Sequence, residues 1–256
     1  MKKRTLIMVG VGSFLLTSLT QLPASLLSKL LPADFPLRPE GVSGTLWQGA
    51  IARLNWLPMP MNNVRWELQP AALFKGQIAA HLQANPLTGG DISATCGISI
   101  TNKLDCQDVQ INAMPIQVLT PYLQNFMLPP LSGSLQASLT RLQWAKPALP
   151  ILEGNAQWQQ AGLQMFPQRF GTYNATLAPG DNGAQQIMLG SAADASFTLS
   201  GNVTVQANGQ YQSAINLKPT GTVDPGTVQF MNNAISPPQA DGSYVINGQG
   251  QLPVGQ

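Results

Sequence analysis

Residues 131–144 read LSGSLQASLTRLQW, and residues 42–56 read VSGTLWQGAIARLNW, a similar run that is one residue longer. Apolar and polar residues alternate in both runs, which is the pattern of strands that bury one face. Each run begins with an apolar residue, any residue, glycine, a polar residue and a second apolar residue. The same pattern recurs around Gly76, and weaker copies surround Gly154, Gly201 and Gly248. Because glycine lets a strand bend, the pattern predicts a strongly curved sheet.

The chain beyond residue 40 is therefore predicted to be mainly β. We expect about a dozen strands, mostly antiparallel, that form an open half-barrel or a sandwich-like domain. Asn208-Gly209 between two alternating runs is a strong hairpin signal. Two short helices are predicted, after Thr120-Pro121 (residues 120–127) and after Asp224-Pro225 (residues 225–232). The echoes between segments suggest internal repetition, although their spacing is too irregular for a solenoid with one strict period.

The first 22 residues resemble a membrane anchor. Lys2, Lys3 and Arg4 precede an uncharged stretch of 18 residues, 5–22, which is just long enough to span a bilayer as a helix. A cleaved signal peptide is the alternative, but LPASLL at residues 22–27 offers a poor cleavage site. The positive-inside rule then places residues 1–4 in the cytoplasm, followed by the transmembrane anchor at 5–22. Residues 23–40 would form a juxtamembrane linker, and residues 41–256 an exported, periplasmic β-domain.

The two cysteines agree with export. Cys96 and Cys106 flank the run GISITNKLD, whose alternation and central turn near Thr101 predict a β-hairpin. Residues symmetric about Thr101 would face each other across that hairpin. A cross-strand disulfide is therefore expected, in an oxidising compartment such as the periplasm.

Composition excludes several classes of protein. Only 9% of the 256 residues are charged and the formal net charge is +2, so a coiled coil and most disordered proteins are excluded. The only cluster of basic residues is at positions 2–4, so a nucleic-acid partner is not expected. Glutamine and asparagine together number 42, and amides must therefore make up much of the polar surface.

The sequence contains no recognisable catalytic arrangement. The one histidine, His81, lies in the alternating run QIAAHLQ and is predicted to be a surface residue of a strand. No G-x-S-x-G elbow or phosphate-binding glycine loop is present, and the cysteines have no histidine partner that would favour a metal. No catalytic residue, metal site or cofactor is therefore predicted. The five tryptophans either fill a thin core or line an apolar groove or interface; they are Trp47, Trp56, Trp66, Trp144 and Trp158.

Two motifs carry a resemblance to a known family. Val42–Gly49 follow the pattern V-x-G-T-x-W-x-G, and Trp66–Gly76 follow W-x-L-x-P-x-x-L-x-x-G. Together with the basic and then apolar N-terminus, these motifs resemble the type II secretion system protein N family. The resemblance assigns structural or interface roles to the motif residues Gly44, Trp47, Gly49, Trp66, Leu68, Pro70, Leu73 and Gly76.

The resemblance implies an accessory, single-pass component of the inner membrane. Such a protein takes part in protein export across the outer membrane through contacts with other secretion-system subunits, and it has no catalytic residues to carry over. The strand and glycine texture is also similar to the periplasmic β-repeats of AsmA-like proteins, which are associated with lipid traffic. A module that binds or transfers a lipid or another apolar ligand is therefore the alternative function.

Overall fold

The protein is described here by a computed structural model, which covers residues 20–26, 38–55, 59–119, 130–145, 147–221, 223–234 and 237–252. In these ranges the chain forms one antiparallel sheet of thirteen strands, each paired with its neighbours in sequence. The strands are β1 Arg38–Gly44, β2 Gln48–Asn55, β3 Met61–Leu68, β4 Gln77–Pro86, β5 Asp91–Ser99, β6 Leu104–Pro115, β7 Leu131–Trp144, β8 Ile151–Leu163, β9 Arg169–Pro179, β10 Gln185–Ser191, β11 Phe197–Val205, β12 Gln210–Pro219 and β13 Tyr244–Gln251. The predicted mainly-β fold is confirmed.

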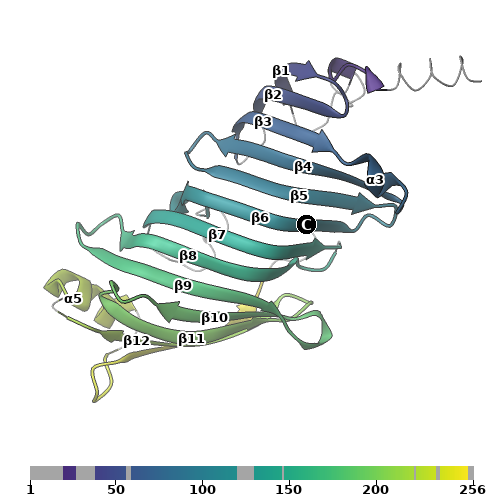
Figure 1. The fold of residues 1–256 in the computed structure, drawn as a ribbon. Coiled ribbons are helices and arrows are strands. Elements are labelled where there is room, and N and C mark those ends of the chain that lie inside the picture. The colour runs from purple at the N-terminus through teal and green to yellow at the C-terminus, as the bar shows by residue number, and fades with distance from the viewer. Residues whose placement is uncertain are drawn as a thin grey trace, which may run out of the picture.

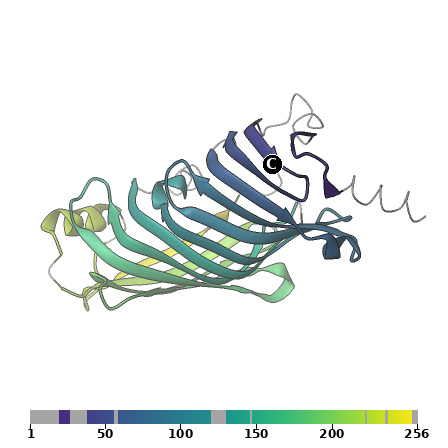
Figure 2. The same ribbon diagram turned by 45° about the horizontal axis from the view of Figure 1, so that its top comes forward.

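The sheet bends into an open trough. Figure 1 shows the strands stacked in chain order, and Figure 2 shows β10–β13 curling round to form a second wall opposite the earlier strands. The first and last strands do not pair with each other. Of the two forms expected from the sequence, the open half-barrel is therefore observed, and the two-sheet sandwich is not.

Short helices lie at the ends of strands. The α-helices are α3 Pro70–Leu73 and α5 Pro225–Ala234, and the 3-10 helices are η1 Ile116–Leu119 and η3 Asp181–Gly183. The helix predicted at residues 225–232 is confirmed as α5, and the Asp224 carboxylate accepts a hydrogen bond from the Thr227 N–H in its first turn (3.1 Å). The helix predicted at residues 120–127 lies outside the described residues.

The strand register separates an apolar face from a polar face. One row of paired residues crosses ten strands, from β4 to β13, and contains only apolar residues and glycine: Ala84, Ile92, Ile111, Ala137, Ala156, Ala175, Leu189, Gly201, Ile215 and Ile246. The next row lies on the other face and is mostly amide or hydroxyl: Gln83, Ser93, Gln110, Ser138, Asn155, Thr176, Met188, Asn202, Ala214 and Asn247. Amides thus take the place of charges on the polar face.

The apolar face is packed most densely beside α5. A core cluster joins Phe170, Phe197 and Tyr244 of the sheet to Met231 of α5, with Trp158 against it. The rings of Phe170 and Phe197 meet edge to face, with centroids 5.6 Å apart. Since α5 lies across one end of the trough in Figure 2, the apolar face lines the inside of the trough there.

The predicted disulfide is confirmed. Cys96 and Cys106 are direct register partners on β5 and β6, and their sulfurs are bonded. Cys106 is buried, in a second core cluster with Val109 and Leu139. The bond therefore ties two strands together at the middle of the apolar face.

The two similar runs of sequence have different structures. Residues 42–55 form the tight hairpin of β1 and β2, in which Gly44 pairs with Gly49. Residues 131–144 instead form the single strand β7, and its pairing with β8 is shifted by a bulge around Gly133. The extra residue in the first run falls at Trp47, in the hairpin turn. In β7 the bulge around Gly133 shifts the register, and the strand continues without a turn.

No helix within the described residues is long and apolar enough to cross a membrane. Residues 5–19 of the predicted anchor lie outside those residues, as do residues 27–37 of the predicted linker and Trp56.

Candidate functional site

The family-type motifs meet at the tip of the β1–β2 hairpin. Gly44 has a φ of +88°, and a Cβ there would lie 2.5 Å from the Gln48 carbonyl oxygen. Opposite it, a Cβ on Gly49 would overlap the indole ring of Trp66. Both positions therefore require glycine, the first for its backbone conformation and both for lack of space.

Trp66 fastens this tip to the next strand. Its indole N–H donates a hydrogen bond to the carbonyl of Leu46 (2.9 Å), and its ring covers Gly49, its register partner on β2. The Leu68 N–H donates to the carbonyl of Trp47 (2.7 Å). Gly44, Gly49, Trp66 and the backbone of Trp47 thus form a single corner of the structure.

The segment that follows the predicted anchor is bound to the same corner. The Ala24 N–H donates to the carbonyl of Gly44 (3.0 Å), and the Leu46 N–H donates to the carbonyl of Leu22 (2.7 Å). Pro23 forms an isolated antiparallel bridge with Thr45. Ala24 is completely buried. We call residues 22–24, 44–49 and 66–68 the clasp, because they hold the chain that enters from the N-terminus against the first hairpin.

The remaining motif residues form the turn next to the clasp. Pro70 begins α3, where its missing N–H costs no helical hydrogen bond. Gly76 has a φ of +68° and leads the chain into β4. Leu73 is exposed rather than buried, so its side chain has no packing role in the described structure.

The two edges of the sheet differ in how well they are protected. On β1, Pro39 lacks a donor, Gly41 has a φ of +68° and Gly44 already accepts a bond from Ala24. The sequence of β13 is YVINGQGQ, which has no charge and no proline, and it pairs with β12 over eight residues without a register shift. Unprotected regular edges are the sites at which another strand can add.

The backbone groups that β13 leaves unpaired can be identified. The Leu252 N–H donates to the carbonyl of Gly209 (2.8 Å), and bonded pairs alternate along an antiparallel ladder. Ile246, Gly248 and Gly250 therefore bond to β12. Val245, Asn247 and Gln249 direct their N–H and C=O groups away from it, and no described strand pairs with them there. This edge was not predicted from the sequence, although the absence of charge in residues 244–251 was a signal for it.

Titratable groups do not gather into a reactive site. The carboxylate of Asp105 accepts hydrogen bonds from Arg141 (2.7 Å) and Gln143 (3.0 Å), and the bond from Arg141 is the main cause that lowers the pKa of Asp105. Burial raises the pKa of Tyr173 to about 12. His81 is on the polar face, as predicted, with Nδ1 3.2 Å from Thr95 Oγ1. Nowhere in the described ranges do three or more His, Cys, Asp or Glu residues come together as metal ligands.

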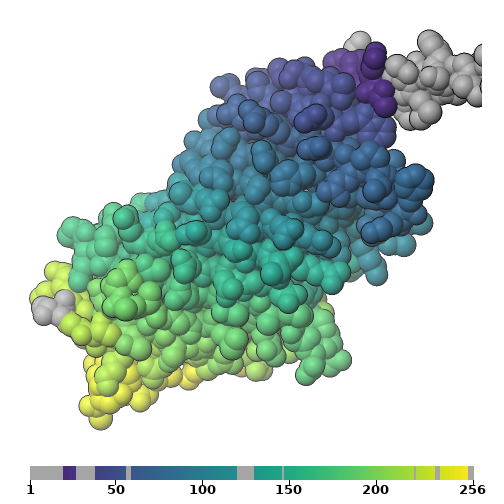
Figure 3. All heavy atoms as spheres, viewed as in Figure 1, coloured from purple at the N-terminus to yellow at the C-terminus, as the bar shows by residue number. Residues whose placement is uncertain are grey.

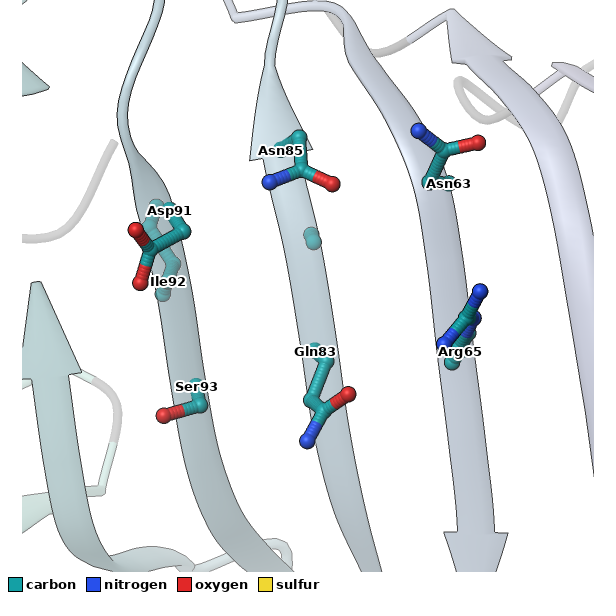
Figure 4. Close-up of a pocket in the computed structure, with 8 residues that line it drawn as sticks. Asn63, Arg65, Gln83, Asn85, Asp91, Ile92 and Ser93 are labelled. Carbon is teal, nitrogen blue, oxygen red and sulfur yellow. The ribbon is translucent and has the colours of Figure 1, made fainter.

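A shallow hollow of about 430 Å³ lies across β3, β4 and β5. Figure 4 shows its lining side chains, among them Arg65, Gln83 and Asp91, spread over three strands rather than converging on one point. Asp91 is already occupied by a hydrogen bond from the Asn112 amide (2.8 Å). The arrangement lacks the convergent polar groups of a small-molecule site.

The family model for the type II secretion system (T2SS), protein N, matches residues 36–247. The chain belongs to this family. The match includes both motifs and ends in the middle of β13, so it covers the clasp from β1 onward and nearly all of the sheet.

Two curated members of the protein N family resemble the chain over almost its whole length. The type II secretion system protein N of Vibrio cholerae serotype O1 is 24% identical over 95% of this chain and 98% of its own. The protein of the same name from Aeromonas hydrophila is 26% identical over 98% of this chain and 100% of its own. No solved structure matches the chain. The resemblance to this family inferred from the motifs is thus confirmed, and the chain is a component of a secretion system.

Proposed function

We propose that the protein acts in type II secretion as a non-catalytic, membrane-anchored docking component, and that another secretion subunit adds a strand to the edge of β13. The observation that carries this proposal is the row of outward-facing backbone groups on Val245, Asn247 and Gln249, which no described strand pairs with. Main-chain hydrogen bonds along such an edge supply affinity, while alternate side chains supply specificity. The polar side chain of Asn247 and the apolar side chain of Ile246 lie on opposite faces of the sheet, so the side chains of an added strand can be recognised on both faces.

The proposed location is the inner membrane, with a single span at residues 5–22, residues 1–4 in the cytoplasm and the β-domain in the periplasm. Support comes from the basic residues before an uncharged stretch and from the Cys96–Cys106 disulfide, which suits an oxidising compartment. The clasp adds a structural reason, since Leu22, the last residue of that stretch, and Ala24, just beyond it, are hydrogen-bonded to the sheet. A short, fixed connection would hold the β13 edge at a defined orientation to the membrane.

The test replaces one outward-facing N–H of β13. Asn247→Pro removes a donor that points away from β12, so the sheet keeps its internal hydrogen bonds and loses only the edge. Asn247→Val retains the N–H and favours a strand, and it serves as the matched control. We expect secretion of an exoprotein by cells that carry Asn247→Pro to fall several-fold, at normal abundance of the protein, and secretion with Asn247→Val to be unchanged.

A proline at the neighbouring position, Ile246, serves as the control for loss of folding. Ile246→Pro removes a donor that bonds to β12, so it should lower the abundance and melting temperature of the protein itself. If Asn247→Pro leaves secretion intact at normal abundance, strand addition at β13 is not the docking mode.

The alternative function, binding or transfer of a lipid or apolar ligand, is favoured by one observation. The row from Ala84 to Ile246 makes an apolar path across ten strands inside the trough, and most of its larger residues are only half-buried. Native mass spectrometry of residues 20–256, prepared without detergent, tests this second proposal. A co-purified lipid that is lost on Ile187→Glu, a change on the same face, would support it, and a ligand-free spectrum beside a loaded control carrier would reject it.

A further inference from the structure

Large exposed apolar side chains gather at one end of the sheet. Of the eleven such residues in the described part of the chain, six lie at the ends of β3–β7: Leu73, Phe74, Ile78, Ile98, Ile100 and Trp144. Phe74 is 94% exposed and Ile100 is 89% exposed, so neither contributes to the folded core. We call these six residues the apolar end. Exposure of this extent in one place indicates a surface that meets another apolar phase.

Three of the six residues are connected through the strand register. Ile78 pairs with Ile98, Ile98 with Leu104, and Leu104 with Trp144, so these four residues form one row on the apolar face of β4–β7. Gln77 pairs with Ser99, and the chain therefore leaves the sheet on one side towards Phe74 and on the other towards Ile100. The indole N–H of Trp144 donates to the carbonyl of Ala148 (2.8 Å), which holds this ring in place.

The charges around the apolar end are positive on the exposed turns. Lys75 follows Phe74, and Lys103 follows Ile100 by three residues; both are exposed, and neither forms an ion pair with a described residue. The neighbouring carboxylates, Glu67 and Asp105, lie on the opposite, polar face, and Asp105 is paired with Arg141. Apolar side chains flanked by lysine are typical of surfaces that contact anionic lipid headgroups.

The apolar end lies beside the clasp. Leu68, whose N–H is bonded to Trp47 in the clasp, is two residues before the start of α3. Figures 1 and 2 both show α3 and the segment 20–26 at the same end of the strands, and Figure 3 shows the α3 region projecting from that side of the molecule. The chain that leads to the predicted anchor therefore leaves the sheet next to the exposed apolar residues.

We propose that the apolar end rests on the lipid surface of the membrane that holds the N-terminal segment, with Phe74 and Ile100 inserted among the acyl chains and Lys75 and Lys103 at anionic headgroups. This inference rests on the anchor in the proposed function, but not on the identity of the secretion partner. The contact would give the sheet a second attachment point besides the clasp. Strand β4, about 30 Å long at about 3.3 Å per residue, would then hold its far end away from the bilayer.

The test measures how close each end of the sheet lies to lipid. The full chain carries a single fluorescent label, NBD, on a cysteine at Thr101 in the turn of the apolar end or at Thr88 in the turn at the far end of β4; both threonines are exposed. Each labelled protein is reconstituted into vesicles of phosphatidylethanolamine and phosphatidylglycerol with and without nitroxide-labelled lipid. We expect strong quenching and a blue-shifted emission at position 101, and at least about a twofold weaker quenching at position 88.

Paired variants separate a lipid contact from mere proximity. With the label at position 101, Phe74→Ser combined with Ile100→Ser should abolish most of the quenching, and Leu87→Ser combined with Met165→Ser, two exposed apolar residues at the other end, should leave it unchanged. With the unchanged lysines, quenching at position 101 should increase with the phosphatidylglycerol content of the vesicles. Lys75→Glu combined with Lys103→Glu should remove this increase. All these side chains are exposed, so folding is expected to be preserved.

Vesicle flotation makes the possible outcomes distinct. If the protein floats with vesicles but positions 101 and 88 are quenched equally, or neither is quenched, the anchor stands and the contact of the apolar end is rejected. If the protein does not float, the proposed anchor fails and this inference fails with it. Docking at β13 is untouched by either result, since the vesicles contain no secretion subunit.

Discussion

Trp66 in the first half of the sheet and Trp158 in the second half are held by similar local contacts but in different surroundings. In the first half, the Trp66 indole covers Gly49 and donates to the Leu46 carbonyl at the hairpin tip. In the second half, the Trp158 indole N–H lies over Gly133 and donates to the Ser132 carbonyl (2.9 Å). Trp158 also packs against the core cluster beside α5, whereas Trp66 belongs to neither core cluster of the described residues.

This difference indicates that the two halves of the sheet have different roles, one in stability and the other in attachment. The half with α5 has a filled core and serves as the stable body of the protein. The first half has a thin apolar layer that depends on glycine–tryptophan contacts, the clasp and one disulfide, and it presents its exposed apolar residues at the end where α3 and residues 20–26 lie. A thin sheet that is held locally can serve for attachment, while the stable half presents the regular β13 edge.

The largest effect is expected from removing the tryptophan of the stable half. Trp158→Ala should lower the free energy of unfolding by about 3–5 kcal/mol, because it removes the ring that packs against the core cluster beside α5, together with a part-buried hydrogen bond. Trp66→Ala, the matched change in the thin half, should cost less, about 1–2 kcal/mol. Urea denaturation of both variants measures the difference. Equal losses would contradict the contrast between the two halves.

Next in size is the disulfide of the thin half. Cys96→Ser combined with Cys106→Ser should lower the free energy of unfolding by about 2–3 kcal/mol, since the bond closes a short loop in the unfolded chain. Urea denaturation of the unmodified protein in a reducing agent should give the same midpoint as the double variant. A midpoint that does not move in either case would mean that the strands hold without the bond.

A smaller effect tests the clasp. Gly44→Ala should lower the free energy of unfolding by about 2 kcal/mol, because the residue has a positive φ and its new methyl group would meet the Gln48 carbonyl. Gly242→Ala is the control, since Gly242 has a φ of +80° and nothing within 4 Å of its Cβ position. The control should cost about 1 kcal/mol from the backbone alone. Thermal denaturation compares them, and an equal loss would show that crowding at the clasp is unimportant.

The smallest expected effect is a pH dependence of the stable half. Burial raises the pKa of Tyr173 from its ordinary value of 10 to about 12, so the unfolded chain releases this proton first as pH rises. Protonated Tyr173 therefore stabilises the folded protein fully below pH 10, and this stabilisation is lost as the pH approaches 12. It amounts to about 1 kcal/mol, since the ring is only half-buried. Tyr173→Phe should therefore be less sensitive to alkali in urea titrations at pH 9 and 11.5. A parallel loss in both proteins would exclude Tyr173 as the cause.

Local signals in the sequence predicted much of the fold. Alternation at period two sorted side chains onto two faces correctly, because strand geometry leaves no other choice once one face is buried. The symmetric spacing of Cys96 and Cys106 about Thr101 predicted their pairing, and Asp224-Pro225 predicted the start of α5. These features depend only on residues close in sequence.

Features that depend on distant backbone contacts could not be predicted. The bonds from Leu22 and Ala24 to the hairpin tip involve only peptide groups, which have no sequence signature. The similar runs at 42–56 and 131–144 also diverged, since one extra residue at Trp47 decides between a hairpin and a continuous strand. The free edge at β13 follows from the order of all thirteen strands, which no single segment encodes.

The central claim, that β13 is the docking edge, is tested most directly by site-specific photo-crosslinking in cells that secrete. A photoreactive residue at Gln249, beside the outward-facing backbone of β13, should give an adduct that mass spectrometry identifies as another type II secretion subunit. The same residue at Glu40, on the protected edge β1, should give none, and Asn247→Pro should abolish the Gln249 adduct. Adducts of equal yield from both edges, or no adduct with a secretion subunit from Gln249, would contradict the account.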